Sequence, residues 1–218
     1  MHGRYSHVSR FITNINTPMS ISVLIVEDEP VIATDIEMTL TGEDYTVVGI
    51  AYSSTKALDL LHRFRPDIVL LDIAIKGDKD GIDIAAIIND KYKVPFIYIT
   101  SFADRETLER AKATLPYGYI VKPFKDKDII SAIEMAIYRH AMDHNTQFPS
   151  IKDIASLVPL TAGEYTVMQC VWEGNTNQQV TEKLNISLNT VKTHLKSIFT
   201  KLEVGSRSAA IAAIRNMK

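Results

Sequence analysis

The chain has 218 residues, of which 46% are hydrophobic and 23% charged, as in an ordinary globular protein with one large or two small domains. No apolar run approaches the ~20 residues of a transmembrane helix, so we expect no membrane partner. The single cysteine, Cys170, excludes an internal disulfide and a cysteine-rich metal site. From residue 157 onward seven Lys and Arg face four Asp and Glu, against 17 and 22 before it, which weakly indicates nucleic-acid contact by the C-terminal part.

Residues 1–20 are polar and lack the apolar core of a secretory signal, so we expect a mobile extension, with Met19 as a candidate biological start. Over 21–140, short runs of branched apolar residues alternate five times with segments of helical periodicity. The predicted strands are 21–26, 45–52, 67–71, 95–100 and 118–121, and the predicted helices are 31–40, 54–64, 82–88, 105–113 and 126–140. This alternation predicts an α/β fold: a doubly wound, five-stranded parallel sheet of order 2-1-3-4-5, with helices on both faces.

The C-terminal part has a different pattern. The periodicity fades over 141–156, which we interpret as a linker, and the pattern over 157–218 is purely helical. Thr161 and Glu164 have the spacing of a capping box at the start of one helix. Three further helices are predicted at 177–184, 188–202 and 206–215. The connection 185–187 is as short as a helix-turn-helix requires, so we expect a small all-α domain of four helices.

Polar side chains stand at the carboxyl ends of four predicted strands, which meet at one edge of a doubly wound sheet. Glu27 and Asp28 follow the first strand and Asp72 the third, while Thr100 ends the fourth and Lys122 follows the fifth. Converging carboxylates repel one another unless a cation lies among them, and carboxylate oxygens with water suit Mg²⁺. A lysine and a hydroxyl at the same place hold the oxygens of a transferring phosphoryl group. The set predicts phosphoryl transfer onto an aspartate.

Each of these residues also has a simpler interpretation. Asp72 is favoured as the cap of a turn, and the dipole of the next helix favours acids such as Glu27 and Asp28 at its start. Lys122 fits an exposed loop and Thr100 an ordinary strand end. Their occurrence at matching strand ends favours a joint site.

Residues 21 to about 140 resemble the receiver domain of bacterial two-component response regulators. The resemblance is carried by the segments 26–30, 71–73, 80–81, 98–101 and 118–124. It implies that Asp72 accepts a phosphoryl group from a sensor histidine kinase, with phosphoryl contacts from Thr100 and Lys122. It also implies a Mg²⁺ ion held by Glu27, Asp28, Asp72 and the backbone carbonyl of Ala74.

The same resemblance implies a cis bond between Lys122 and Pro123. It places Tyr119 at the family's switch aromatic, acting with Thr100, although a packing aromatic is the alternative. Ala74, two residues past the acceptor, has no polar group to orient an attacking water, so we expect slow self-dephosphorylation. Two lysines of the long polar segment that follows, Lys76 and Lys79, are candidates for kinase contact, and the simpler interpretation is a solvated loop.

The predicted helix 188–202 has one apolar stripe and one face of Lys, Asn and Thr, with no acidic residue. Such a face suits the major groove of DNA, whereas a merely solvated face usually carries both signs of charge. Residues 160–216 resemble the LuxR-type (NarL/FixJ-type) DNA-binding domain, most closely over 190–202. The candidate DNA contacts are Thr176, Asn177, Asn189, Thr190, Lys192, Thr193, His194, Lys196, Lys201 and Arg207. Of these, Thr176 and Asn177 would bind a phosphate through backbone N–H groups at a helix N-terminus.

Together these patterns predict a cytoplasmic response regulator that binds double-stranded promoter DNA and forms a homodimer when phosphorylated. It would not be an enzyme beyond assisting its own phosphoryl transfer and slow autodephosphorylation. One rival is a phosphatase with an Asp nucleophile, but such an enzyme needs a second Asp where Ala74 stands. The other rivals are a receiver that acts through protein contacts alone and a regulator that is never phosphorylated.

Overall fold

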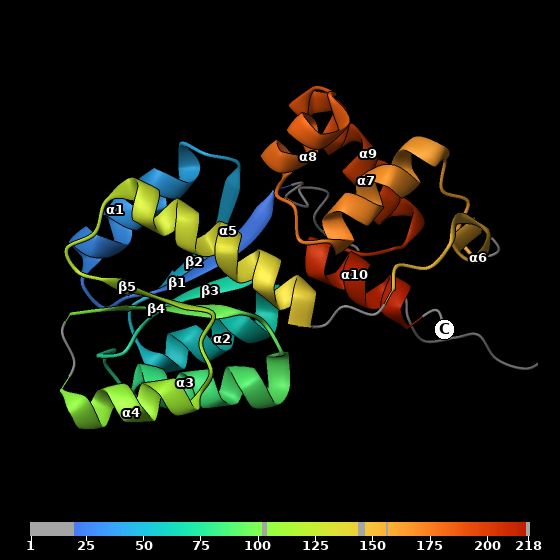
Figure 1. Cartoon of the computed structure of the whole chain (residues 1–218). Helices are drawn as coiled ribbons and strands as arrows, with labels where there is room; N and C mark the ends of the chain where they lie inside the picture. Colours follow the sequence, from blue (N-terminus) through green and yellow to red (C-terminus); the bar gives the residue numbers. More distant parts are fainter. Residues whose placement is uncertain (1–19, 102–103, 144–146, 156, 217–218) are drawn as a thin grey trace, which may run out of the picture.

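The computed structural model describes residues 20–101, 104–143, 147–155 and 157–216. The expected N-terminal extension, 1–20, therefore lies outside the described residues except for Ser20. Figure 1 shows an α/β unit followed by a unit of short helices. No helix in this described part is long and apolar enough to cross a bilayer.

The strands form one parallel sheet of order β2-β1-β3-β4-β5, which confirms the predicted topology. They are β1 (Ile21–Val26), β2 (Tyr45–Ala51), β3 (Ile68–Asp72), β4 (Phe96–Thr100) and β5 (Gly118–Val121). Val26 pairs with Leu71, and Asp72 pairs with Ile99. The three central strands consequently end at the same edge, so the residues that follow them share one crevice.

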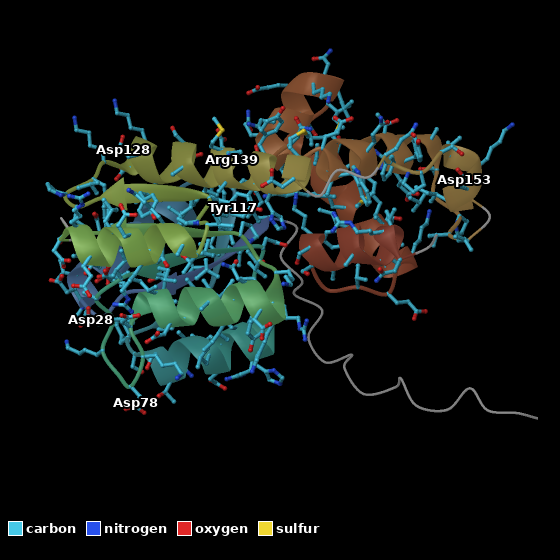
Figure 2. The ribbon with its side chains drawn as sticks, turned by 60° about the horizontal axis from the view of Figure 1, so that its bottom comes forward. Asp28, Asp78, Tyr117, Asp128, Arg139 and Asp153 are labelled. Atoms are coloured by element: carbon cyan, nitrogen blue, oxygen red, sulfur yellow. The ribbon has the colours of Figure 1, made fainter. Side chains whose placement is uncertain are left out.

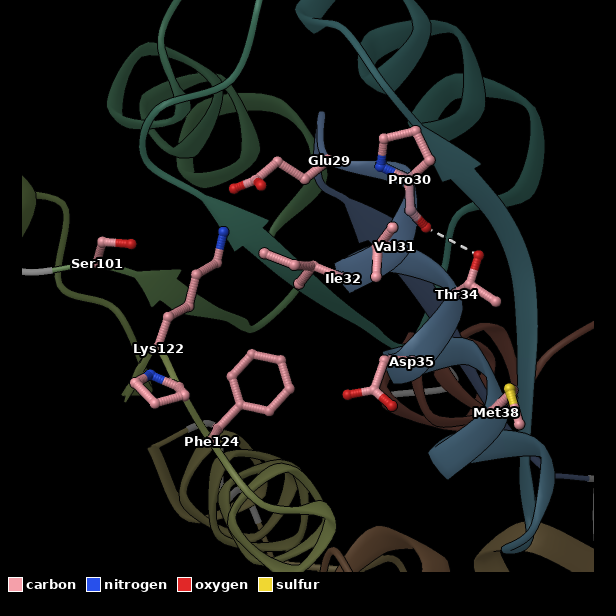
Figure 3. Close-up of a pocket in the computed structure, with 11 residues that line it drawn as sticks. Glu29, Pro30, Val31, Ile32, Thr34, Asp35, Met38, Ser101, Lys122 and Phe124 are labelled. Carbon is pink, nitrogen blue, oxygen red and sulfur yellow. Dashed lines mark hydrogen bonds between the residues drawn. The ribbon is translucent and has the colours of Figure 1, made fainter.

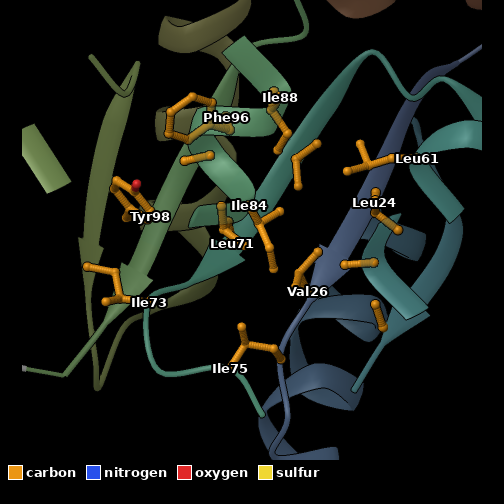
Figure 4. Close-up of a cluster of buried hydrophobic side chains, with 14 of the residues drawn as sticks. Leu24, Val26, Leu61, Leu71, Ile73, Ile75, Ile84, Ile88, Phe96 and Tyr98 are labelled. Carbon is orange, nitrogen blue, oxygen red and sulfur yellow. The ribbon is translucent and has the colours of Figure 1, made fainter. Parts of the chain in front are cut away.

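Helices cover both faces of the sheet (Figure 1). They are α1 (Pro30–Thr41) and α5 (Asp126–Asp143) on one face, and α2 (Ser54–Phe64), α3 (Gly81–Ile87) and α4 (Arg105–Ala113) on the other. Successive residues of a strand point to opposite faces. Leu24 and Leu71 therefore join the cluster under α2 and α3 in Figure 4, whereas Ile25 and Leu70 pack beneath α1 and α5. A π-helical turn, η1 (Ile88–Tyr92), extends α3 and was not predicted.

The second unit is built from α6 (Ile151–Ala155), α7 (Ala162–Trp172), α8 (Asn177–Leu184), α9 (Leu188–Lys201) and α10 (Arg207–Arg215). A Ser or Thr side chain accepts a backbone N–H at the start of each of the last four helices. Such caps satisfy N–H groups that have no partner within the helix. The short helix α6 lies inside the expected linker. Ile154 of α6 is buried in the core of this unit and Phe148 packs on Trp172, so this part of the linker belongs to the helical unit.

The helical unit packs against the amino edge of the sheet. Asp44 and Asp67, which directly precede β2 and β3, both accept hydrogen bonds from it. Gly174, at φ +83°, lies so close to α5 that a Cβ there would be 2.9 Å from the Cβ of Ala141. Contact with the helical unit accordingly occurs at the end of the sheet opposite to the edge where Asp72 lies.

Candidate phosphorylation site and nucleic-acid interface

Three carboxylates meet at the carboxyl edge of the sheet. Glu27, Asp28 and Asp72 each offer an oxygen that lies within 4.8 Å of the others. Glu27 and Asp72 are buried, and Asp28 is partly exposed at the rim. Hard carboxylate oxygens that converge beside solvent fit Mg²⁺, which keeps several water ligands and takes one or two protein carboxylates.

Lys122 enters this cluster from the end of β5. Its Nζ lies 2.7 Å from Glu27 Oε2 and 2.7 Å from Asp72 Oδ2. Figure 3 shows its side chain extending between Ser101 and Glu29. The Lys122–Pro123 bond is cis, as predicted. The four groups sum to a charge of −2, which a divalent cation would balance.

The electrostatics of the cluster follow from burial and pairing. Burial lowers the pKa of Lys122, but hydrogen bonds to Asp72 and Glu27 outweigh it and raise that pKa overall. Burial raises the pKa of Glu27, and the neighbouring Asp72 charge adds to this against the opposing hydrogen bond from Lys122. Lys122 is thus held as a cation between two acids.

Asp72 is oriented by its neighbours at both carboxylate oxygens. Oδ1 accepts the backbone N–H of Ala74 at 3.0 Å, and Oδ2 accepts Lys122. Thr100 ends the adjacent strand, but its hydroxyl donates to the carbonyl of Ser101 at 2.6 Å. Tyr119 is 38% exposed and stacks on Tyr98 with 5.5 Å between ring centroids. The roles of Thr100 and Tyr119 as a switch pair stay predictions.

Two ion pairs beside the site involve residues to which the sequence gave no such role. Lys76 Nζ lies 3.0 Å from Asp28 Oδ2, so this lysine of the expected solvated loop contacts a candidate metal ligand. Arg110 of α4 lies 2.8 Å from Asp80, which caps α3. No local pattern identifies either pair, because each joins residues separated by 30 or more positions.

A hollow of about 780 Å³ adjoins the acidic crevice between α1 and the segment after β5 (Figure 3). Val31 and Met38 of α1 are 83% and 69% exposed on its rim, and Phe124 faces them. Exposed apolar side chains of this size, gathered beside polar groups, are typical of interaction surfaces.

The predicted DNA-reading helix is α9. Its apolar residues Val191, Leu195 and Ile198 are buried against the other helices, which leaves a polar face outward. The candidate contacts that are exposed on this face are Asn189, Thr190, Thr193 and Lys196, with His194 partly exposed.

Two other candidate contacts, Lys192 and Asn177, bond to a side chain of the α/β unit. Lys192 Nζ of α9 lies 2.6 Å from Asp44 Oδ1, and Asn177 Nδ2 of α8 donates to Asp44 Oδ2 at 2.7 Å. The single carboxylate of Asp44 therefore pairs with both side chains at once. Asp67 makes a third contact, because its Oδ1 accepts the backbone N–H of Ser208 at the start of α10 at 2.8 Å.

The remaining candidates, Arg207, Lys201 and Thr176, have partners inside the helical unit, and their contact with phosphate stays a prediction. Arg207 is buried and donates to the carbonyls of Val171 and Asn175 inside the helical unit. Burial lowers its pKa to about 10. Lys201 Nζ lies 2.7 Å from Glu164, and Thr176 uses both its hydroxyl and its backbone N–H in a capping box. Their donors are thus already bonded within the helical unit.

The fold and the acidic crevice define a receiver-type α/β unit joined to a helix-turn-helix unit. Residues 23–134 match the response regulator receiver domain family, and residues 158–214 match the bacterial regulatory proteins of the luxR family. The chain belongs to the response regulators, with a receiver domain and a C-terminal LuxR-type domain.

Individual relatives agree with this assignment. The response regulator protein VraR of Staphylococcus aureus is 30% identical over 200 residues, 88% of this chain and 95% of VraR. The transcriptional regulatory protein PdtaR of Mycobacterium tuberculosis is 39% identical over 117 residues, but the match spans only 54% of this chain and 57% of PdtaR. The signal receiver domain of a modulated diguanylate cyclase from Desulfovibrio desulfuricans is a structural match, with a TM-score of 0.54 and 36% identity over 56% of this chain and 98% of that one.

Proposed function

We propose that this protein is a DNA-binding response regulator of a two-component phosphorelay, which accepts a phosphoryl group on Asp72 and regulates transcription. The observation that carries the proposal is the contact of Lys122 with both Asp72 and Glu27, at 2.7 Å each, in a crevice that also contains Asp28. A buried carboxylate between a lysine and two further acids suits phosphoryl acceptance better than a structural role.

The chain's own groups account for most of the transfer chemistry. The Asp72 carboxylate would attack the phosphorus of a kinase phosphohistidine, so that an O–P bond forms while the N–P bond breaks and the imidazole keeps the electron pair. Lys122 would neutralise charge on the phosphoryl oxygens, and Thr100 would donate its hydroxyl to one of them. Glu27, Asp28, Asp72 and the Ala74 carbonyl would hold Mg²⁺, which supplies further neutralisation of that charge.

The hollow between α1 and the segment after β5 is the surface that we assign to the histidine kinase. It adjoins Lys122, and its rim carries the exposed apolar residues Val31 and Met38. A kinase docked there would bring its phosphohistidine to the mouth of the crevice.

Labelling with acetyl phosphate tests the acceptor. We expect the wild type to take up one phosphoryl group and Asp72→Asn to take up none, while Asp78→Asn, in the exposed loop nearby, labels normally. The label on the wild type should persist for minutes or longer because Ala74 cannot orient a water. Labelling that survives in Asp72→Asn removes the acceptor from its role, and a half-life of seconds contradicts slow dephosphorylation.

DNA binding would be controlled by the packing of the two units. Asp44 occupies Lys192 and Asn177, so α9 cannot present its full polar face to a major groove in this arrangement. In Figure 2 the helical unit lies at the end of the α/β unit opposite to Asp28. The signal would therefore cross the sheet as a population shift, which releases the helical unit and favours a homodimer on paired DNA half-sites.

A further inference from the structure

The loop between β3 and α3 is held in place, and this fixes where Lys76 lies. Ile75 is buried in the core cluster at the lower edge of Figure 4. The carbonyl oxygen of the next residue, Lys76, accepts a hydrogen bond from the backbone N–H of Ser54, with 2.8 Å between oxygen and nitrogen. Gly77 follows at φ +128°, where any side chain would collide with Ser54. The chain before Lys76 is thus anchored in the core, and the chain after it is anchored at the N-terminus of α2.

From this anchored position the Lys76 side chain reaches the acidic crevice. Its Nζ lies 3.0 Å from Asp28 Oδ2, although the side chain is 75% exposed. Asp28 is the most exposed of the three clustered acids and so the natural entry for an ion from solvent. Lys79, three residues on, lies in the same loop and makes no ion pair among the described residues, so the contact is specific to Lys76.

The charges show what this contact does. The charges of the three carboxylates and Lys122 sum to −2, which one divalent ion balances. When the charge of Lys76 is included, the sum is only −1. An ion that binds Asp28 must displace the Lys76 ammonium from the same oxygen or remain beside its positive charge. Either way, binding of the ion and pairing of Lys76 oppose each other.

We propose that Lys76 is a built-in competitor for the divalent ion at Asp28, which weakens Mg²⁺ binding and thereby sets the ion concentration at which the site becomes ready for phosphoryl transfer. The proposal rests on the proposed function, because it requires Asp28 to be a Mg²⁺ ligand. It adds a residue of this chain's own long loop to the site, with a role that can be measured without phosphorylation.

Calorimetric titration of the full-length protein with MgCl₂ at low ionic strength tests it. We expect Lys76→Gln to lower the Mg²⁺ dissociation constant roughly two- to fivefold, the factor that corresponds to one partly exposed ion pair. Lys76→Arg should stay near the wild type, and Lys79→Gln is the matched control for loss of a loop charge without loss of the contact. The advantage of Lys76→Gln should shrink at about 0.5 M KCl, because salt screens exposed charges.

The outcomes separate the inference from its foundation. If Lys76→Gln and Lys79→Gln change the Mg²⁺ dissociation constant equally, the competition is refuted and Lys76 is only a solvated loop residue. The proposed metal site is not affected by that result. Undiminished Mg²⁺ binding by Asp28→Asn shows that Asp28 is no ligand, which refutes the competition as well. A wild type that binds no Mg²⁺ at about 10 mM, and Lys76→Gln likewise, overturns the proposed metal site together with this inference.

Discussion

Glu164 illustrates how a single residue links two helices of the DNA-binding unit. It completes the capping box of α7 with Thr161, and its carboxylate also accepts the ammonium of Lys201, from the end of α9, at 2.7 Å. Burial raises the pKa of Glu164, but the hydrogen bonds from Lys201, Ser197 and Thr161 outweigh it and lower the pKa from 4.5 to about 2. The ionised form is therefore the one that the folded unit stabilises.

This shift predicts a pH-dependent loss of stability. A carboxyl whose pKa is depressed on folding stabilises the protein above its unfolded pKa, and the contribution disappears as the pH falls through the folded pKa. We expect Glu164→Gln to lower the free energy of unfolding of the helical unit at pH 7 by about 1–3 kcal/mol. The difference from the wild type should diminish between pH 4.5 and about 2.

The chain contains one tryptophan, Trp172 at the end of α7, so its fluorescence in a denaturant titration reports from the helical unit. Glu203→Gln, at an exposed acid of the same unit, is the control and should leave the midpoint unchanged. A destabilisation by Glu164→Gln that is the same at pH 3 and pH 7 would contradict the assignment.

The predicted DNA-reading helix, α9, depends on its own first turn. α9 follows a connection of three residues, and Asn185 takes the left-handed conformation at φ +51° to end α8. Ser187 then caps α9, with its hydroxyl accepting the N–H of Thr190 at 3.1 Å. Because Ser187 lies between the two helices, the cap fixes the direction in which α9 leaves the turn.

Removal of this cap should weaken the helical unit. We expect Ser187→Ala to cost about 1 kcal/mol of unfolding free energy, since one backbone N–H loses its acceptor. Ser187→Asp should retain the stability, because Asp is an equally good cap. Tryptophan fluorescence of the full-length protein measures both variants. Equal stability of Ser187→Ala and the wild type would rule out the capping role.

At the scale of the whole molecule, the two units meet through a few charged contacts. Asp44 bonds to Lys192 and Asn177, and Asp67 bonds to the N-terminus of α10. Two carboxylates of the receiver domain thus bond to a lysine and to a helix N-terminus, which are groups that attract phosphate when they are free. The closed arrangement and a DNA complex would compete for Lys192, so the proposed phosphorylation at Asp72 would need only to shift the balance between closed and open forms.

Opening of this contact should raise the DNA affinity of the unphosphorylated protein. Asp44→Asn keeps every candidate DNA contact but weakens the contact with Lys192 by about 1 kcal/mol, which corresponds to roughly fivefold tighter binding if the closed form predominates. Fluorescence anisotropy with a DNA fragment selected from random sequence measures this. Glu43→Gln removes a neighbouring exposed charge that has no ion pair among the described residues, and equal effects of the two variants would refute the competition.

Local pattern predicted most of the elements. Strand runs and helical periods located every strand of the sheet, the helices that cover it and α7 to α10, because each signal lies within one segment. The prediction failed where packing decides the local structure. The π turn after α3 and the short helix α6 have weak patterns of their own, and α6 forms where Ile154 finds a buried place. α5 also runs three residues past its predicted end, alongside Gly174 of the other unit.

The sequence by itself determined the chemistry of the acidic crevice, since a parallel sheet brings all carboxyl strand ends to one edge whatever the loops do. Glu27, Asp28, Asp72 and Lys122 were therefore predictable together. Only the tertiary structure decided that Arg207 and Lys201 are bonded within the helical unit, that Lys76 contacts Asp28, and that Asp44 occupies Lys192. Those partners lie from 32 to 148 positions apart in the chain, and no periodicity within one segment encodes which distant polar groups meet.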